Sequence, residues 1–312
     1  MNILHHMRKE NSGLARTTLE IVKYEERLGH RVCIKEPSNE MPMYGVLPDD
    51  KVDVHAIHSQ LGLKAYHNNL PKFLFMHGEP LSSVGNGVSM KAIVDLAPMV
   101  DAFIAMRKDE MPIWQSIKRT YLVDKGVDLE VFKPLDGITE KLSGEPSVLY
   151  VENWRGQRNP LYLCVAMEQV WKKYPNARLH LYNCNDKRMQ ETFLALSKNN
   201  KWWPFLRSLQ GGVNGGEEMN LLYNRADIVV SCLYPLYARS IEAFGSGKAF
   251  IGTGYKEHDY PWQCDLHPDS IAKAIIDCWE NFDKIDYRKW AEKYHDANES
   301  ARQCVEIYKR YL

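Results

Sequence analysis

The sequence lacks an excess of charge of either sign, a long apolar run and paired cysteines. It carries 40 basic and 40 acidic residues, so it has no surplus typical of a dedicated nucleic-acid-binding protein. No run of about eighteen apolar residues is present, which excludes a predicted transmembrane helix. The seven cysteines are scattered without a C-x-x-C pair, which excludes a zinc ribbon and indicates a reducing compartment. We therefore expect a cytoplasmic protein.

The composition that is present is typical of a folded chain with two domains. Aromatic residues make up 11% of the 312 residues and charged residues 26%, and the length suits two domains of ordinary size. A short strand-like segment at 2–4, a loop, an amphipathic pattern over 14–28 and a second strand-like segment at 31–34 predict a strand–helix–strand opening. A similar opening starts at residue 147, after a polar stretch. These patterns predict an α/β fold with domains 1–139 and 140–312.

The stretch 226–254 carries the strongest functional signal. Apolar runs at 228–230 and 249–251 enclose a helical pattern that contains Glu242, which predicts a parallel βαβ unit. The start of such a helix favours an anionic group such as a diphosphate, and Glu242 could accept hydrogen bonds from a ribose diol. An ordinary crossover helix with a solvated glutamate is the alternative.

Two segments resemble signatures of one enzyme family. The residues I-E-A-F-G-S-G-K-A-F-I-G-T-G at 241–254 and G-V-D-L-E-V-F-K-P at 126–134 are similar to those of GT-B glycosyltransferases, in particular retaining family 4. The resemblance covers most of the chain. It implies two Rossmann-like domains that face each other across a cleft, with the acceptor on the N-terminal domain and the sugar donor on the C-terminal one. The last helix, about 291–312, would cross back to the N-terminal domain.

The resemblance also implies the residues of a site. His77 ends an apolar strand and would lie near the donor sugar and the acceptor, although a histidine that only fills a strand end is the alternative. Arg158, or else Arg155, would neutralise the leaving diphosphate, and each could instead be a solvated loop charge. With Glu242, His77 and Arg158 are the candidate catalytic residues. The remaining candidates bind the donor: Ser12, Gly13, Val213, Tyr234, Tyr237, Arg239, Ser240 and Ile241.

The chain departs from the family pattern at two positions. The family has a glutamate eight positions before the one at 242, where this chain has Tyr234, and an arginine where it has Asn153. Either the pattern is shifted or the sugar is held differently, with Tyr234, Tyr237 or Arg239 supplying the missing group.

The implied reaction is metal-independent transfer of a sugar, with retention, from a nucleoside diphosphate sugar to a hydroxyl acceptor. A UDP-sugar is favoured as the donor, and no cofactor is expected beyond this co-substrate. A glycan, a lipid-linked sugar and a small molecule stay open as acceptors, as does weak peripheral contact with a membrane. Two other functions stay open: transfer to hydroxylated bases in DNA, and binding of a nucleotide sugar without transfer.

His5 and His6 point to opposite faces of a strand, so they cannot share a metal.

Overall fold

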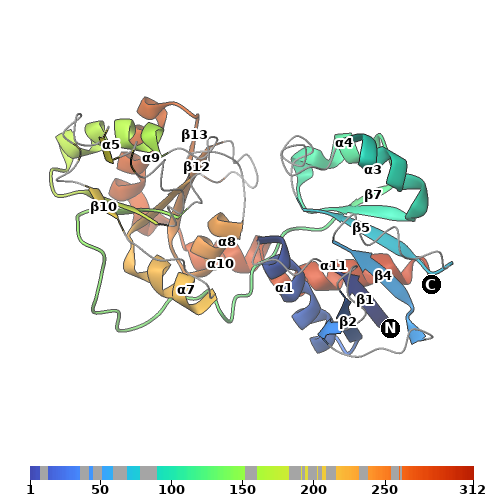
Figure 1. The fold of residues 1–312 in the computed structure, drawn as a ribbon. Coiled ribbons are helices and arrows are strands. Elements are labelled where there is room, and N and C mark those ends of the chain that lie inside the picture. The colour runs from blue at the N-terminus through green and yellow to red at the C-terminus, as the bar shows by residue number, and fades with distance from the viewer. Residues whose placement is uncertain are drawn as a thin grey trace. The chain divides into compact units, whose positions relative to one another are not determined.

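The computed structural model describes residues 1–7, 13–35, 42–44, 51–58, 69–77, 90–151, 160–182, 191, 194–195, 202, 206–208, 216–231, 238–253, 260 and 262–312. The chain divides into two compact units (Figure 1). Unit 1 comprises Met1–Val127 and Tyr294–Leu312, and unit 2 comprises Asp128–Lys293. No helix in the described ranges is long and apolar enough to cross a membrane.

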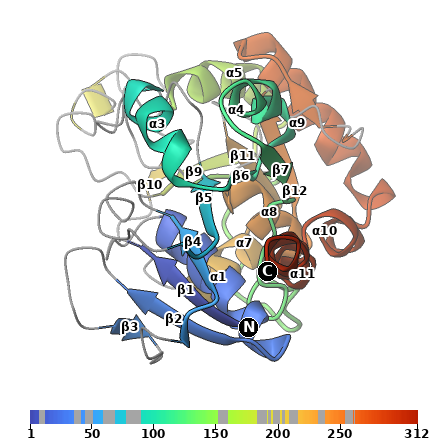
Figure 2. The same ribbon diagram turned by 90° about the vertical axis from the view of Figure 1, so that its right-hand side faces the viewer.

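Unit 1 is built on a seven-stranded sheet in the order β3-β2-β1-β4-β5-β6-β7. All neighbouring strands pair in parallel except β2 and β3. The strand order reverses between β1 and β4, and Figure 2 shows β2, β1, β4 and β5 side by side. The strands are β1 Asn2–His6, β2 Arg31–Lys35, β3 Pro42–Tyr44, β4 Val54–Ile57, β5 Lys72–Met76, β6 Ala102–Ala105 and β7 Thr120–Leu122.

Helices cover both faces of this sheet, and the alternation of side chains along β5 shows why. Phe73 and Phe75 belong to the core under α1 (Gly13–Arg27) and α11 (Ala297–Lys309). The intervening Leu74 and Met76 belong to a second core. That second core lies under α3 (Met90–Leu96), the 3-10 helix η3 (Ala97–Met99) and α4 (Met111–Gln115), which follows the 3-10 helix η4 (Lys108–Glu110). A strand buried on both faces is a nearly continuous apolar run, as β5 is from Phe73 to Met76.

Unit 2 has a six-stranded sheet in the order β10-β9-β8-β11-β12-β13, and every neighbouring pair is parallel. This is the doubly wound nucleotide-binding order, which reverses between β8 and β11. Its strands are β8 Ser147–Tyr150, β9 Arg178–Leu181, β10 Leu206–Ser208, β11 Ile228–Ser231, β12 Ala249–Thr253 and β13 Gln263–Cys264. Its helices are α5 Leu161–Lys173, α7 Gly216–Arg225, α8 Ala238–Gly245, α9 Pro268–Asn281, η6 Phe282–Lys284 and α10 Tyr287–Tyr294.

The two signature segments pack against each other within unit 2. A Cβ at Gly245 would lie 3.0 Å from Phe132 Cβ, and one at Gly247 would lie 3.0 Å from Pro134 Cγ. The Arg288 guanidinium donates to the carbonyls of Leu129, Phe132 and Gly245. Residues 128–135 therefore belong to unit 2, whereas the sequence places the domain boundary near residue 139.

The end of the chain differs from the expected single helix over about 291–312. It forms α10 and α11, separated at His295 and Asp296. Asp296 caps α11 by accepting a hydrogen bond from the Asn298 backbone N–H at 2.9 Å, which starts a new helix. The α11 residues Cys304, Ile307 and Tyr308 lie in the core of unit 1.

Candidate functional site

Histidines gather at the carboxyl ends of the unit 1 strands, where the strand order reverses. His5 lies at the end of β1, His58 directly follows β4 and His77 directly follows β5. Ligands bind at this edge of open parallel sheets, next to the switch point. Of the predicted site residues, His77 is thus at an edge that suits a functional role.

These histidines form a continuous chain of hydrogen bonds with a buried carboxylate. Glu25 Oε2 on α1 lies 2.7 Å from His5 Nε2, and His5 Nδ1 lies 2.9 Å from His58 Nε2. His58 Nδ1 in turn lies 2.7 Å from His77 Nε2. Glu25 and His5 are completely buried, and His58 is 3% exposed. The chain therefore runs from the interior of unit 1 to the sheet edge at His77.

His6 takes no part in this chain, because its side chain points to the other face of β1. Its Nε2 lies 2.9 Å from His55 Nδ1, in a second buried pair. The opposite orientations of His5 and His6 agree with the expectation that they do not share a ligand. Within the described ranges, no group of three or more histidine, cysteine, aspartate or glutamate residues has metal-binding geometry.

Burial keeps several of these imidazoles neutral at ordinary pH. Desolvation, with a smaller contribution from Lys125, lowers the pKa of His77 to about 3. Desolvation also lowers the pKa of His6 to about 3 and that of His58 well below its ordinary value, with neighbouring histidines adding to both effects. A neutral imidazole has one donor and one acceptor nitrogen, so the tautomer of each ring decides which groups it can bind.

In unit 2, the predicted site residue Glu242 lies on α8, which follows β11 at the carboxyl edge of the sheet. It is 1% exposed, and its Oε2 accepts hydrogen bonds from the Tyr223 hydroxyl at 2.9 Å and from Arg239 Nη1 at 3.0 Å. Burial and the nearby Glu242 raise the Tyr223 pKa well above its ordinary value. Glu242 is therefore a buried carboxylate held by protein groups, and its predicted contact with a ribose stays a prediction.

The other described candidates on α8 differ in exposure. Arg239 has 23% of its side chain exposed at the start of the helix. Ser240 and Ile241 are each 1% exposed. Only Arg239 among these three presents a charged side chain with solvent access. The start of the helix combines this cation with the partial positive charge of the helix dipole, an arrangement that favours an anion.

Six predicted site residues lie outside the described part of the chain. They are Ser12, Arg155, Arg158, Val213, Tyr234 and Tyr237. Gly13 is the first residue of α1. The predicted roles of these seven residues in donor binding stay predictions.

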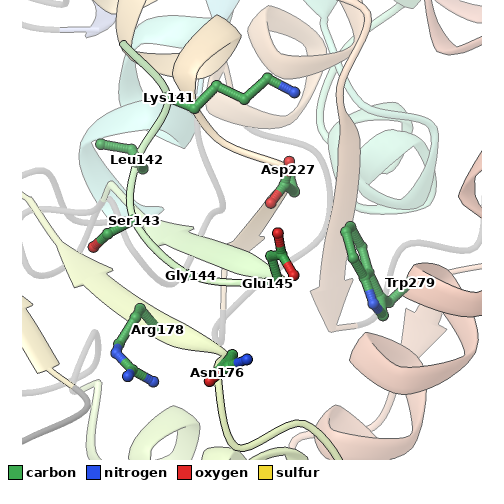
Figure 3. A pocket seen from close by; sticks show the side chains of 9 residues that line it. All are labelled: Lys141, Leu142, Ser143, Gly144, Glu145, Asn176, Arg178, Asp227 and Trp279. Carbon is green, nitrogen blue, oxygen red and sulfur yellow. The ribbon is translucent and has the colours of Figure 1, made fainter.

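A hollow in unit 2 lies at the amino edge of the sheet, whereas open parallel sheets bind ligands at the carboxyl edge. It has a volume of about 760 Å³ and adjoins the amino ends of β8 and β9 (Figure 3). Two of its charged groups have structural partners: Asp227 accepts hydrogen bonds from the backbone N–H and hydroxyl of Ser147, and Arg178 donates to two nearby carbonyls. It is lined by Lys141, Leu142, Ser143, Gly144, Glu145, Asn176, Arg178, Asp227 and Trp279.

Comparison with known proteins gives a match in structure alone. No protein-family model and no curated protein sequence matches the chain. Sucrose-phosphate synthase from Thermosynechococcus elongatus superposes with a TM-score of 0.76 over 99% of this chain and 98% of that chain, at 14% identity. HepE from Anabaena, solved with UDP-glucose, gives a TM-score of 0.74 over 99% and 100%, at 13% identity. The catalytic domain of starch synthase IV from Arabidopsis thaliana, bound to ADP and acarbose, gives 0.69 over 99% of each chain, at 10% identity.

The chain has the GT-B fold. The structural agreement extends over nearly its whole length, and the two mainly parallel sheets have the strand arrangement expected of Rossmann-like domains. The predicted fold is confirmed.

Within this GT-B chain, sequence reasoning missed the partners of the predicted residues. Tyr223, which holds Glu242, has the appearance of an ordinary core residue of α7. Glu25 lies in an amphipathic helix, where a glutamate is usually solvated. His58 directly follows β4. A run of histidines at successive strand ends was the available signal, because parallel strands bring their carboxyl ends to one edge.

Proposed function

We propose that this protein is a glycosyltransferase that moves a sugar from a nucleoside diphosphate sugar to a hydroxyl acceptor. The observation that carries the proposal is the match over nearly the full length to three solved structures. They are a sucrose-phosphate synthase, HepE in complex with UDP-glucose, and the catalytic domain of starch synthase IV bound to ADP and acarbose. The family-like segments at 126–134 and 241–254 support it, because they pack directly on each other through Phe132 and Gly245.

The donor is proposed to bind at the carboxyl edge of the unit 2 sheet. Its diphosphate would lie at the start of α8, where Arg239 and the helix N-terminus provide positive charge. Glu242 would take the ribose, with Tyr223 and Arg239 fixing the orientation of its carboxylate. A UDP-sugar is the favoured donor, in keeping with the nucleotide bound in the HepE structure.

Retention and independence from metal are part of the proposal. A leaving diphosphate can be stabilised by side-chain cations and backbone N–H groups aimed at it. Arg158 or Arg155, which follow β8 in the sequence, would supply these cations together with Arg239. His77 of unit 1 would bind a hydroxyl of the donor sugar or of the acceptor through its neutral imidazole.

A donor panel tests the proposal. Purified protein is mixed with UDP-, GDP-, ADP- and TDP-sugars, and the melting temperature is measured. Because a ligand at a hundredfold excess over its Kd stabilises the folded state by about 2.7 kcal/mol, binding gives a clear upward shift. We expect one donor class to stabilise the protein.

The matched variants are Glu242→Gln and Glu217→Gln. Glu217 is an exposed glutamate on the neighbouring helix α7, so its amide variant reports nonspecific effects. The stabilisation should be lost in Glu242→Gln and retained in Glu217→Gln. The proposal fails if no nucleotide sugar stabilises the folded wild-type protein.

A further inference from the structure

The hydrogen-bonded chain Glu25–His5–His58–His77, here called the histidine chain, occupies every ring nitrogen of its two central members. His5 uses Nε2 toward Glu25 and Nδ1 toward His58. His58 uses Nε2 toward His5 and Nδ1 toward His77. With both rings neutral, each has one donor and one acceptor nitrogen, so each donates on one side and accepts on the other.

This alternation gives the histidine chain a direction. An ionised carboxylate only accepts hydrogen bonds, so with Glu25 ionised His5 carries its proton on Nε2. His5 Nδ1 is then an acceptor, which requires the proton of His58 on Nε2. His58 Nδ1 is an acceptor in turn, which places the proton of His77 on Nε2. The outcome at the sheet edge is a His77 ring with an unprotonated Nδ1.

We propose that Glu25, His5 and His58 are positioning residues that hold His77 in the tautomer protonated at Nε2, so that its Nδ1 accepts a hydrogen bond from a hydroxyl of the sugar substrate. The proposal rests on the proposed function for the identity of the substrate, but the tautomer itself does not depend on it. Among the described residues, none makes a hydrogen bond to His77 Nδ1. The low pKa of His77 means that the ring is neutral near pH 7, so one tautomer dominates or two exchange.

The structure indicates why three buried residues are needed to select one tautomer of His77. A neutral imidazole in isolation can carry its proton on either nitrogen, and a hydrogen bond to one nitrogen from a neighbouring group is the usual means of selecting one form. Here the group at the buried end is Glu25, which is 0% exposed and is separated from His77 by two imidazoles. The ring stacking of His58 on Phe75, with centroids 4.2 Å apart, fixes the middle of the histidine chain.

The test measures the tautomer directly by NMR of ¹⁵N-labelled protein, since protonated and unprotonated ring nitrogens have well-separated chemical shifts. The His77 signals are assigned by their loss in His77→Gln. In the wild type, without any substrate, we expect a protonated Nε2 and an unprotonated Nδ1. In His58→Phe, which keeps a ring against Phe75 but removes both hydrogen bonds, this preference should be lost.

The matched control is His55→Phe, which removes the neighbouring hydrogen bond to His6 but leaves the histidine chain complete. It should retain the wild-type tautomer of His77. Glu25→Gln serves if His58→Phe does not fold, because it keeps the shape of the side chain but removes the charge that sets the direction. It should give a mixture of His77 tautomers.

Kinetics with the donor identified by the panel complete the test. We expect kcat/KM to fall about ten- to a hundredfold in His58→Phe and Glu25→Gln, the factor that corresponds to loss of a buried hydrogen bond, and to stay near the wild-type value in His55→Phe. A wild-type His77 protonated at Nδ1, or one whose tautomer is unchanged in both variants, would overturn the proposal. So would tautomer changes that leave kcat/KM at the level of His55→Phe. If no donor binds or reacts, the proposed function fails, while the tautomer measurement still decides whether the histidine chain sets the state of His77.

Discussion

Acidification from pH 7.5 to 5.5 should destabilise unit 1 through its buried histidines. The pKa values of His6 and His58 are lowered by desolvation, to about 3 for His6 and well below the ordinary value for His58. Their pKa in the unfolded chain is about 6.5. Between these values the unfolded state binds protons that the folded state does not, so stability rises with pH and is lost as the pH falls below 6.5.

The loss in the free energy of unfolding hardly depends on the pKa of a buried histidine in the folded state, provided that this pKa lies well below 5.5. At pH 5.5 the unfolded chain holds nearly one proton on each of these histidines, so each lowers the free energy of unfolding by about 1.4 kcal/mol relative to pH 7.5. His6 and His58, which are 0% and 3% exposed, together account for about 2.7 kcal/mol. His77 adds to this in the same direction. Glu299 and Glu306 have lowered pKa values, so they act mainly at lower pH.

Hydrogen exchange of backbone amides in β1 and β5 provides the assay, after correction for the intrinsic exchange rate at each pH. Protection in these strands should fall by about a hundredfold or more between pH 7.5 and 5.5 if they exchange through unfolding of unit 1. The loss should be about tenfold smaller in His58→Phe. His267→Asn alters an exposed helix cap in unit 2, so the loss of protection in β1 and β5 should be the same as in the wild type. Equal wild-type stability of unit 1 at the two pH values would refute the reasoning.

Three substitutions test the packing that positions the candidate site, each by the free energy of unfolding in urea. Gly126→Ala should cost roughly 3 kcal/mol, because its Cβ would lie 2.4 Å from Ala297 Cα; Gly29→Ala, which only has to adopt a φ of 84° in open space, should cost about 1 kcal/mol, and equal costs would contradict the account. Arg288→Met should destabilise unit 2 by about 3 kcal/mol by leaving three carbonyls without their donor. Its control, Arg302→Met, breaks an exposed ion pair with Glu299 and should cost less than about 1 kcal/mol. Phe132→Ala should cost about 3–5 kcal/mol, since Phe132 is 1% exposed and its ring centroid lies 6.3 Å from that of Tyr223 on α7; a cost below 1 kcal/mol would show that this ring does not contribute to the core of unit 2.

Much of the fold could be predicted because its main elements are local. After a polar first residue, the runs 2–4, 31–34 and 147–151 are apolar, as expected of strands buried on both faces, and they correspond to β1, β2 and β8. The break before α11 was missed because the apolar pattern continues across it. Asp296 ends that continuity by capping a new helix and by pairing with Val127, a contact between segments far apart in the sequence.

The site could be predicted only in part, for a similar reason. Glu242 and His77 were found because each follows a recognisable strand. Their partners come from elsewhere in the chain: Tyr223 from α7 and Glu25 from α1. No local pattern indicates that the Glu25 side chain reaches a histidine on the neighbouring strand, since a glutamate in an amphipathic helix is usually solvated. The histidine chain therefore became visible only with the parallel register of β1, β4 and β5.

The measurement that tests the central claim most directly is the release of nucleoside diphosphate from the donor that stabilises the protein. It is followed over time with wild-type protein and with His77→Ala, in the absence and presence of hydroxyl acceptors that include oligosaccharides, lipid-linked sugars and DNA with hydroxymethylated bases. The account predicts slow release of the diphosphate without an acceptor, faster release together with a glycosylated product when the right acceptor is present, and loss of the acceleration in His77→Ala. Tight binding of the donor with no release under any of these conditions would contradict it, and would leave a GT-B protein that binds a nucleotide sugar without transferring it.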